Sequence, residues 1–96
     1  MDDVIARIDA QRRRIEGVQR SVAQMEITGR AAGGDVTATL KGTGQFTSIT
    51  IDPAAMRRHD ADTVAASVLE AVNDGLRRLA EVQRTKFEPI IAEARG

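Results

Sequence analysis

The fold is decided between residues 36 and 51, which read VTATLKGTGQFTSITI. In the first half of this stretch every second residue is apolar, and the residues between are Thr or Lys. After the break Gly42-Thr43-Gly44, a similar alternation returns from Thr47 to Ile51. A period of two is typical of a half-buried strand, and a short break with glycines is typical of a tight turn. The stretch therefore predicts a β-hairpin with one apolar face.

The register of this hairpin determines the face on which Phe46 lies. We assume a two-residue loop at Thr43 and Gly44. The facing pairs are then Val36 with Ile51, Ala38 with Ile49, and Leu40 with Thr47. In this register Phe46 falls on the polar face beside Lys41. It is then a lone exposed aromatic residue, part of a bulge, or part of a subunit contact. We favour the subunit contact, because a sheet of two or three strands is hard to stabilise alone.

A long helix is predicted before the hairpin, from Asp3 to about Ile27. Its apolar residues recur three and four apart in one stripe, made of Met1, Val4, Ile8, Ile15, Val18, Val22 and Met25. About 25 residues give a helix of roughly 37 Å, longer than the roughly 32 Å width expected of a compact chain of this size. The helix should therefore overhang the body. We expect it to pack on the C-terminal helix, or antiparallel on a partner, because a parallel pair would set Arg7 against Arg12.

A second long helix is predicted from about Asp62 to Glu88, after the connector 54–59. The dipeptide Asp52-Pro53 ends the second strand, since proline cannot donate a hydrogen bond to a sheet. Asp60 or Asp62 is the expected N-cap of the helix. Pro89 should stop or kink it, leaving residues 90–96 as a short tail.

These elements predict one α+β domain over residues 1–96. It has a long N-terminal helix, a three-stranded antiparallel sheet and a long C-terminal helix. The sheet comprises the hairpin 35–51 and a weakly indicated short strand near 26–31. Gly75 lies within the second helix, where it costs roughly 1 kcal/mol relative to alanine. A close backbone crossing would explain it, and so would chance.

The composition excludes several classes of function. The chain has no Cys, no Trp and no Tyr, and His59 is its only histidine. Disulfides, Cys-ligated zinc, a thiol nucleophile and base stacking on aromatic side chains are therefore not expected. A single histidine gives no second imidazole for a metal and little basis for a Ser-His-Asp triad, and no phosphate-binding glycine loop is present. We therefore expect no enzyme activity, no cofactor and no metal. The acidic start and the lack of a long apolar run predict a cytoplasmic protein without membrane contact.

Positive charge is local, because 14 basic residues balance 14 acidic residues. Residues 7–20 contain five arginines against Asp9 and Glu16. One interpretation is an ordinary solvated helix with i,i+4 ion pairs such as Asp9–Arg13. The other is a strip of arginines that contacts phosphates. Charge alone favours the first interpretation. The candidate DNA contacts are Arg7, Arg12, Arg13, Arg14, Arg20, Arg77, Arg78, Arg84 and Lys86.

Four segments carry a family resemblance. They are MEITG at 25–29, GGDVTATLKG at 33–42, ITIDP at 49–53 and AVNDGLRR at 71–78. Together they resemble the YbaB/EbfC family of bacterial nucleoid-associated proteins over roughly residues 15–88. The resemblance implies a helix–three strands–helix subunit, a tight homodimer with projecting helical arms, and DNA binding of modest sequence specificity. Gly75 departs from the family, in which alanine is usual at this position. Because the family has no sharp DNA-contact motif, the candidate contacts above rest on charge.

The leading hypothesis is a nucleoid-associated homodimer that binds double-stranded DNA through its phosphates. Its expected dimer contacts are Phe46, Ile49, Ile51, Val68, Val72, Gly75 and Leu76. The alternative is a protein-interaction adaptor or chaperone-like module that uses its helical arms or its Thr-rich sheet face. A structural subunit of a larger assembly is a third option. A continuous basic ridge on the arms would favour DNA.

Overall fold

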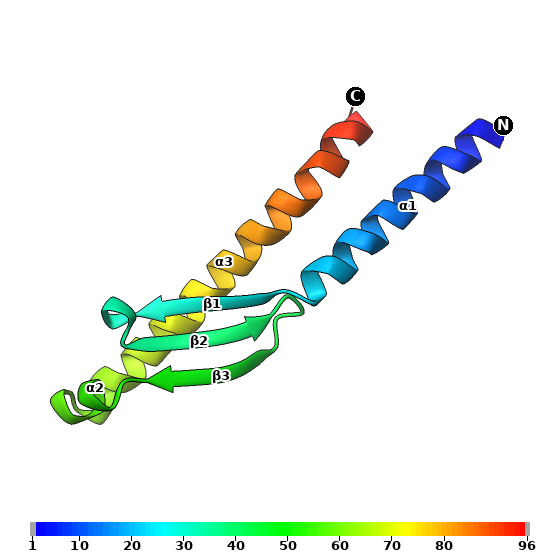
Figure 1. Cartoon of the computed structure of the whole chain (residues 1–96). Coiled ribbons are helices and arrows are strands. Elements are labelled where there is room, and N and C mark those ends of the chain that lie inside the picture. Colours follow the sequence, from blue (N-terminus) through cyan, green and yellow to red (C-terminus); the bar gives the residue numbers. More distant parts are fainter. Residues whose placement is uncertain (1, 96) are drawn as a thin grey trace.

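The computed structural model describes the backbone of residues 2–95 and the side chains of residues 4–92. The elements in order are α1 (Asp2–Ala23), β1 (Glu26–Ala31), the 3-10 turn η1 (Ala32–Gly34), β2 (Val36–Lys41), β3 (Phe46–Ile51), α2 (Pro53–Arg58) and α3 (Ala61–Arg95). The strands form one antiparallel sheet in the order β1-β2-β3 (Figure 1). The expected α+β architecture, including the weakly indicated strand near 26–31, is confirmed.

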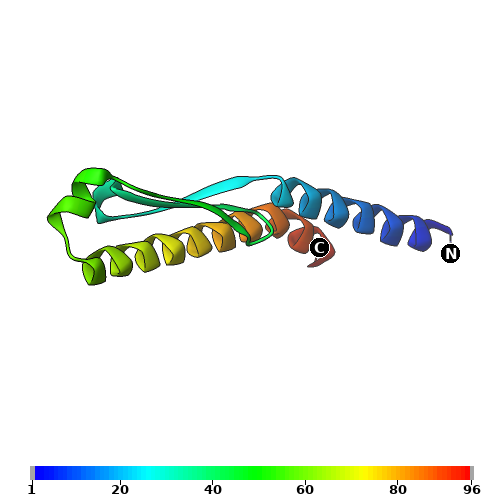
Figure 2. The ribbon, with the colours of Figure 1, turned by 90° about the horizontal axis from the view of Figure 1, so that it is seen from below.

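The molecule is elongated, measuring 67 × 21 × 16 Å along its principal axes. The sheet and α3 form two layers, and α1 continues the long axis beyond the sheet (Figure 2). Near the sheet, Val18 of α1 packs with Val82 of α3 around the buried Val22 and Leu79. The long first helix therefore overhangs the body and packs on its own C-terminal helix, as predicted. Met1 of the predicted stripe lies outside the described residues.

The hairpin register agrees with the prediction up to a bulge. Val36 pairs with Ile51 and Ala38 with Ile49, but Leu40 pairs with Phe46 because the register shifts between Thr39 and Leu40. The turn is one residue longer than assumed: the Lys41 N–H donates to Gln45 O, and Gly44 has a φ of +92°. A three-residue loop that ends in a left-handed glycine is a common hairpin connection. The register shift lies beyond this loop, where Thr47 of β3 has no partner in β2.

The bulge places Phe46 on the apolar face, so the prediction of a polar-face position was wrong. Phe46 is half-buried and packs against both apolar clusters of the subunit. One cluster is formed by Val22, Ile27, Leu40 and Leu79. The other is formed by Ala31, Val36, Ala38 and Ala71. Phe46 therefore joins the two halves of the core.

The backbones of β1 and α3 cross in direct contact at Gly29 and Gly75. A Cβ on Gly29 would collide with the carbonyl oxygen of Ala71 and the backbone nitrogen of Gly75. A Cβ on Gly75 would lie 3.0 Å from Leu40 Cδ2. The close crossing proposed for Gly75 is confirmed, and it sets α3 against β1.

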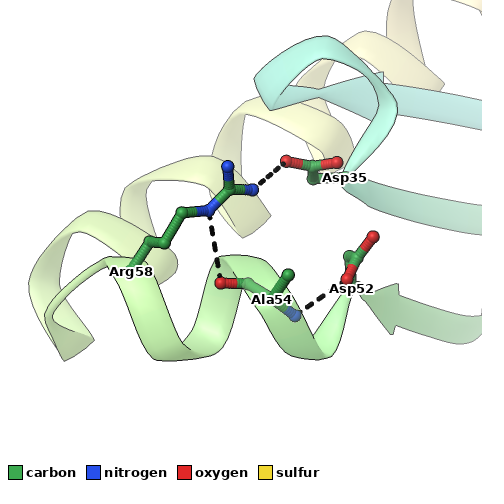
Figure 3. A network of polar contacts seen from close by, with 4 residues as sticks. All are labelled: Asp35, Asp52, Ala54 and Arg58. Atoms are coloured by element: carbon green, nitrogen blue, oxygen red, sulfur yellow. Dashed lines mark hydrogen bonds and ion pairs between the residues drawn. The ribbon is translucent and has the colours of Figure 1, made fainter.

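The connector after the hairpin is helical, in contrast to the prediction. Pro53 occupies the first turn of α2, where its missing N–H costs nothing, and the Asp52 carboxylate accepts the Ala54 N–H at 2.8 Å. Arg58 donates from Nε to Ala54 O and from Nη2 to Asp35 (Figure 3). These contacts tie the short helix to the start of β2.

Both long helices end at different residues from those predicted. α1 stops at Ala23 rather than near Ile27, because Glu26 already begins β1. Asp60 is the cap of α3, since its carboxylate accepts the Thr63 N–H at 2.8 Å. α3 continues through Pro89, which removes one intrahelical hydrogen bond but has a φ compatible with a helix. Because the helix continues past Pro89, the side chain of Ile90 is buried, with 6% exposure. This burial is favourable and offsets part of the cost of the lost hydrogen bond.

Candidate nucleic-acid interface

The cations of α1 lie on a projecting helical arm. Arg13 forms the i,i+4 ion pair predicted with Asp9, at 2.7 Å, with its side chain 78% exposed. Arg7, Arg12 and Arg20 are exposed and form no ion pair with any other side chain in residues 4–92. Among the side chains of residues 4–92, these three guanidinium groups therefore have no ion pair to lose when they bind an external anion.

The two arginines at the base of the α3 arm are paired with a carboxylate instead. Arg78 Nε lies 2.9 Å from Asp74 Oδ2, and Arg77 Nη2 lies 3.5 Å from Asp74 Oδ1. Asp74 Oδ2 also accepts the backbone N–H of Arg30 in β1 at 2.9 Å. The Arg30 backbone hydrogen bond, followed by the Arg78 hydrogen bond, lowers the pKa of Asp74 below its ordinary value. Asp74 therefore stays ionised and holds both arginines.

Asp74 is the residue of this region that charge counting missed. Its i,i+3 and i,i+4 spacing to Arg77 and Arg78 is visible in the sequence and predicts ion pairs on a helix. Its bond to Arg30 joins residues 44 positions apart and depends on the β1–α3 crossing. The arginine pair and its carboxylate therefore form one structural unit, defined here as the Asp74 cluster (Arg30, Asp74, Arg77 and Arg78).

Charge is segregated along this neutral chain. Residues 4–23 of α1 contain five arginines and two acids, a net charge of +3. Residues 77–92 of α3 contain four basic residues and two acids, a net charge of +2. The intervening residues 24–76 contain four basic residues and seven acids, a net charge of −3. Taken whole, α1 (Asp2–Ala23) has a net charge of +1 and α3 (Ala61–Arg95) has a net charge of −1. The positive charge is therefore local and strongest at residues 7–20 of the α1 arm, where a phosphate contact is favoured.

The basic residues of α2 lie at the opposite end of the molecule from the arms (Figure 1). Arg58 is held by Asp35 at 3.3 Å (Figure 3). Asp52, Asp60 and Asp62 surround α2 in the sequence. Acidic neighbours therefore offset the positive charge of this end, and it adds no second basic surface.

A second surface is apolar and lies where α3 meets β3. Ile49 and Leu76 are each 43% exposed, and Leu69 is 62% exposed. Val68 and Val72 beside them are half-buried. The surface stays open because α3 packs along β1 and β2 and leaves β3 uncovered. Five residues of the predicted dimer contact, Ile49, Ile51, Val68, Val72 and Leu76, gather here.

The other two predicted dimer residues contact the core. Gly75 is buried at the crossing with Gly29, whereas Phe46 is half-buried, as Val68 and Val72 are, and packs against both core clusters. We define the α3–β3 surface by the remaining five predicted residues and Leu69, which the prediction had omitted. Leu69 was omitted because only a structure shows that the outward side of α3 lies next to an open strand edge.

The described residues contain no other chemical centre. No group of three or more His, Asp or Glu side chains in the described part of the chain is arranged to hold a metal ion. No described helix has the length and apolar character needed to cross a membrane.

Comparison with known proteins gives one consistent family. Residues 1–94 match the model of the YbaB/EbfC DNA-binding family. A nucleoid-associated protein of Rhodococcus erythropolis is 34% identical over 90 residues, covering 94% of this chain and 80% of that protein. One from Saccharopolyspora erythraea is 32% identical over 96 residues, covering 100% of this chain and 83% of that protein. The crystal structure of an uncharacterized protein from Helicobacter pylori shares the fold, with a TM-score of 0.77 at 16% identity, covering 95% and 96% of the two chains.

Proposed function

Because this chain belongs to the YbaB/EbfC DNA-binding family, we propose that it binds double-stranded DNA in the nucleoid as a homodimer. The observation that carries the proposal is the local excess of positive charge on the α1 arm, where residues 7–20 contain five arginines and two acids. A duplex is attracted by this local positive charge even though the whole chain is neutral, because charges beyond about 10 Å are screened at ordinary salt.

Contacts to DNA phosphates are made chiefly by arginines of the α1 arm. Arg7, Arg12 and Arg20 have no carboxylate partner among the described side chains, so they lose no ion pair when they bind a phosphate. The planar guanidinium group matches phosphate oxygens in a bidentate geometry. Phosphate contacts position a protein on DNA without identifying bases, so binding has low sequence specificity.

The homodimer forms through the α3–β3 surface. Ile49 and Leu76 are exposed on this surface, next to the half-buried Val68 and Val72. Burying such a contiguous apolar patch against a second copy is favourable by about 25 cal/mol per Å² of area removed from water. The unpaired edge of β3 adds backbone donors and acceptors to this contact.

Fluorescence anisotropy with a labelled duplex tests the DNA-binding proposal. The double variant Arg12→Gln/Arg20→Gln removes two unpaired cations of the arm, and we expect it to bind at least about tenfold more weakly. Lys41→Gln/Arg57→Gln is the charge-matched control, since it removes two exposed cations from the acidic body. If wild-type protein leaves the duplex free even at low salt, DNA binding is not its function.

A protein-interaction module is the second candidate, and one observation favours it. Val4, Ile5 and Ile8 on α1 are 57%, 64% and 54% exposed. A shallow hollow of about 270 Å³ lies beside them, lined by Ile5, Ile8, Asp9 and Arg12. An apolar stripe of this kind can receive a partner helix. Retention of a stable protein partner by a charge-reversed variant that leaves the lining of the hollow unchanged, Arg13→Glu/Arg14→Glu/Arg20→Glu, would support this function and not DNA binding.

A further inference from the structure

Asp74 occupies the base of the α3 arm and gathers donors from two elements. It accepts the Arg30 backbone N–H of β1 and the Arg78 side chain of α3, each at 2.9 Å, and pairs with Arg77 at 3.5 Å. The Asp74 side chain is only 20% exposed, whereas Arg77 and Arg78 are 67% and 53% exposed. The carboxylate thus lies beneath two guanidinium groups that face solvent.

The backbone bond to Arg30 makes this carboxylate a fixed group. The N–H that it accepts belongs to the outer edge of β1, which has β2 on its other side. Releasing Asp74 would leave that edge donor without a protein partner. A phosphate that approaches Arg78 therefore meets a guanidinium whose Nε is already occupied and whose charge is offset by a carboxylate that does not swing away.

We propose that Asp74 is a built-in competitor for phosphate that limits the contribution of Arg77 and Arg78 to DNA affinity. The proposal rests on the proposed DNA-binding function and assigns a regulatory role within that surface. Affinity is then carried by the unpaired arginines of α1, while the Asp74 cluster remains a partly neutralised site. The chain has zero net charge, and the charges of Arg77 and Arg78 are offset by Asp74. We therefore expect DNA binding weak enough for moderate salt to release the duplex.

The size of the effect follows from geometry. A phosphate about 4 Å from a guanidinium lies roughly 7 Å from the carboxylate behind it, and that repulsion in a water-exposed setting corresponds to about threefold to tenfold weaker binding. Asp74→Asn removes the charge and keeps an oxygen that can accept the Arg30 N–H. The variant should therefore bind a duplex about threefold to tenfold more tightly than wild type at about 50 mM salt.

Asp60→Asn is the matched control for this experiment. It also removes one negative charge, and asparagine remains a good N-cap for α3. We expect its affinity to stay within about twofold of wild type, because Asp60 lies in the turn between α2 and α3, and α2 is at the end of the body opposite the arms (Figure 1). Equal tightening by both variants, or no tightening by Asp74→Asn, overturns the proposal while wild-type DNA binding stands.

Two further outcomes separate this proposal from the proposed function. If wild type fails to bind DNA and Asp74→Asn binds, masking is supported and DNA binding by the native chain is refuted. If neither protein binds, both are refuted.

A second pair of variants leaves Asp74 and its backbone bond untouched. Arg78→Gln removes a masked arginine, and Arg12→Gln removes an unpaired one. Masking predicts that Arg78→Gln weakens binding by less than about threefold and Arg12→Gln by about fivefold or more. Equal losses would show that Asp74 does not mask Arg78.

Discussion

Gly29 and Gly75 bring the backbones of β1 and α3 into contact, and this contact positions the arm. The two glycines differ in tolerance, because a Cβ on Gly29 meets backbone atoms of Ala71 and Gly75, whereas a Cβ on Gly75 meets the movable end of Leu40 at 3.0 Å. The packing constraint therefore lies mainly on the strand.

Gly29→Ala should destabilise the fold by about 3 kcal/mol or more, because backbone atoms cannot give way to the new methyl group. Gly75→Ala should change stability by no more than about 1 kcal/mol, since the helical preference of alanine offsets the shift of Leu40. Urea unfolding followed by circular dichroism measures both. Equal destabilisation by the two variants would contradict the asymmetry.

Ile49→Lys/Leu76→Lys should convert the dimer to a folded monomer. Both residues are exposed in the single subunit, so the charges harm the interface more than the fold. Light scattering at micromolar concentration gives the mass, and circular dichroism reports the fold. Met56→Lys is the control, because Met56 is 54% exposed on α2, away from the α3–β3 surface. A wild-type monomer, or a double variant that stays dimeric, would show that this surface is not the interface.

Stability should decline as the pH falls below about 4. Hydrogen bonds from the Arg30 backbone and Arg78 lower the pKa of Asp74 from 3.8. A carboxyl group with a lowered folded-state pKa stabilises the protein above its unfolded pKa, and that stabilisation is lost as pH falls through the folded value. The Tm of Asp74→Asn should therefore change less between pH 5 and pH 2.5 than the wild-type Tm. Equal acid sensitivity would contradict the contribution of Asp74.

Phe46→Ala should cost about 2–4 kcal/mol, because the ring packs against both core clusters. The polar-face position predicted from a two-residue loop would make the same substitution nearly neutral. Thermal unfolding of Phe46→Ala in an Ile49→Lys/Leu76→Lys background separates the core contribution from any effect on dimerisation. A loss below about 0.5 kcal/mol would contradict the bulged register.

The sequence predicts the elements of this fold because their periodicity is local. The alternation in residues 36–51 specifies the hairpin, and the three-four spacing specifies both long helices. The position of Phe46 was not predictable in this way, since one added loop residue and one bulge reverse its face. Pro89 misled the prediction for a related reason. Its local preference to end a helix yields to the burial of Ile90.

The candidate site was only partly predictable for the same reason. The arginines of α1 were named as candidates from the charge along one helix. Their position on an overhanging arm was expected because the predicted helix is longer than a compact body of this size. The Asp74 cluster depends on β1 crossing α3, which no local pattern specifies. Five of the seven predicted dimer residues lie on the α3–β3 surface, whereas Gly75 is buried and Phe46 is half-buried against the core.

The salt dependence of wild-type affinity for a duplex tests most directly whether the arginines on the α1 arm of this neutral protein bind phosphates. Each neutralised phosphate contributes about −0.9 to the slope of log K against log salt concentration. With several unpaired arginines in each copy of a dimer, we predict a slope between about −3 and −7. A slope near zero, or no binding at about 50 mM salt, would contradict the account.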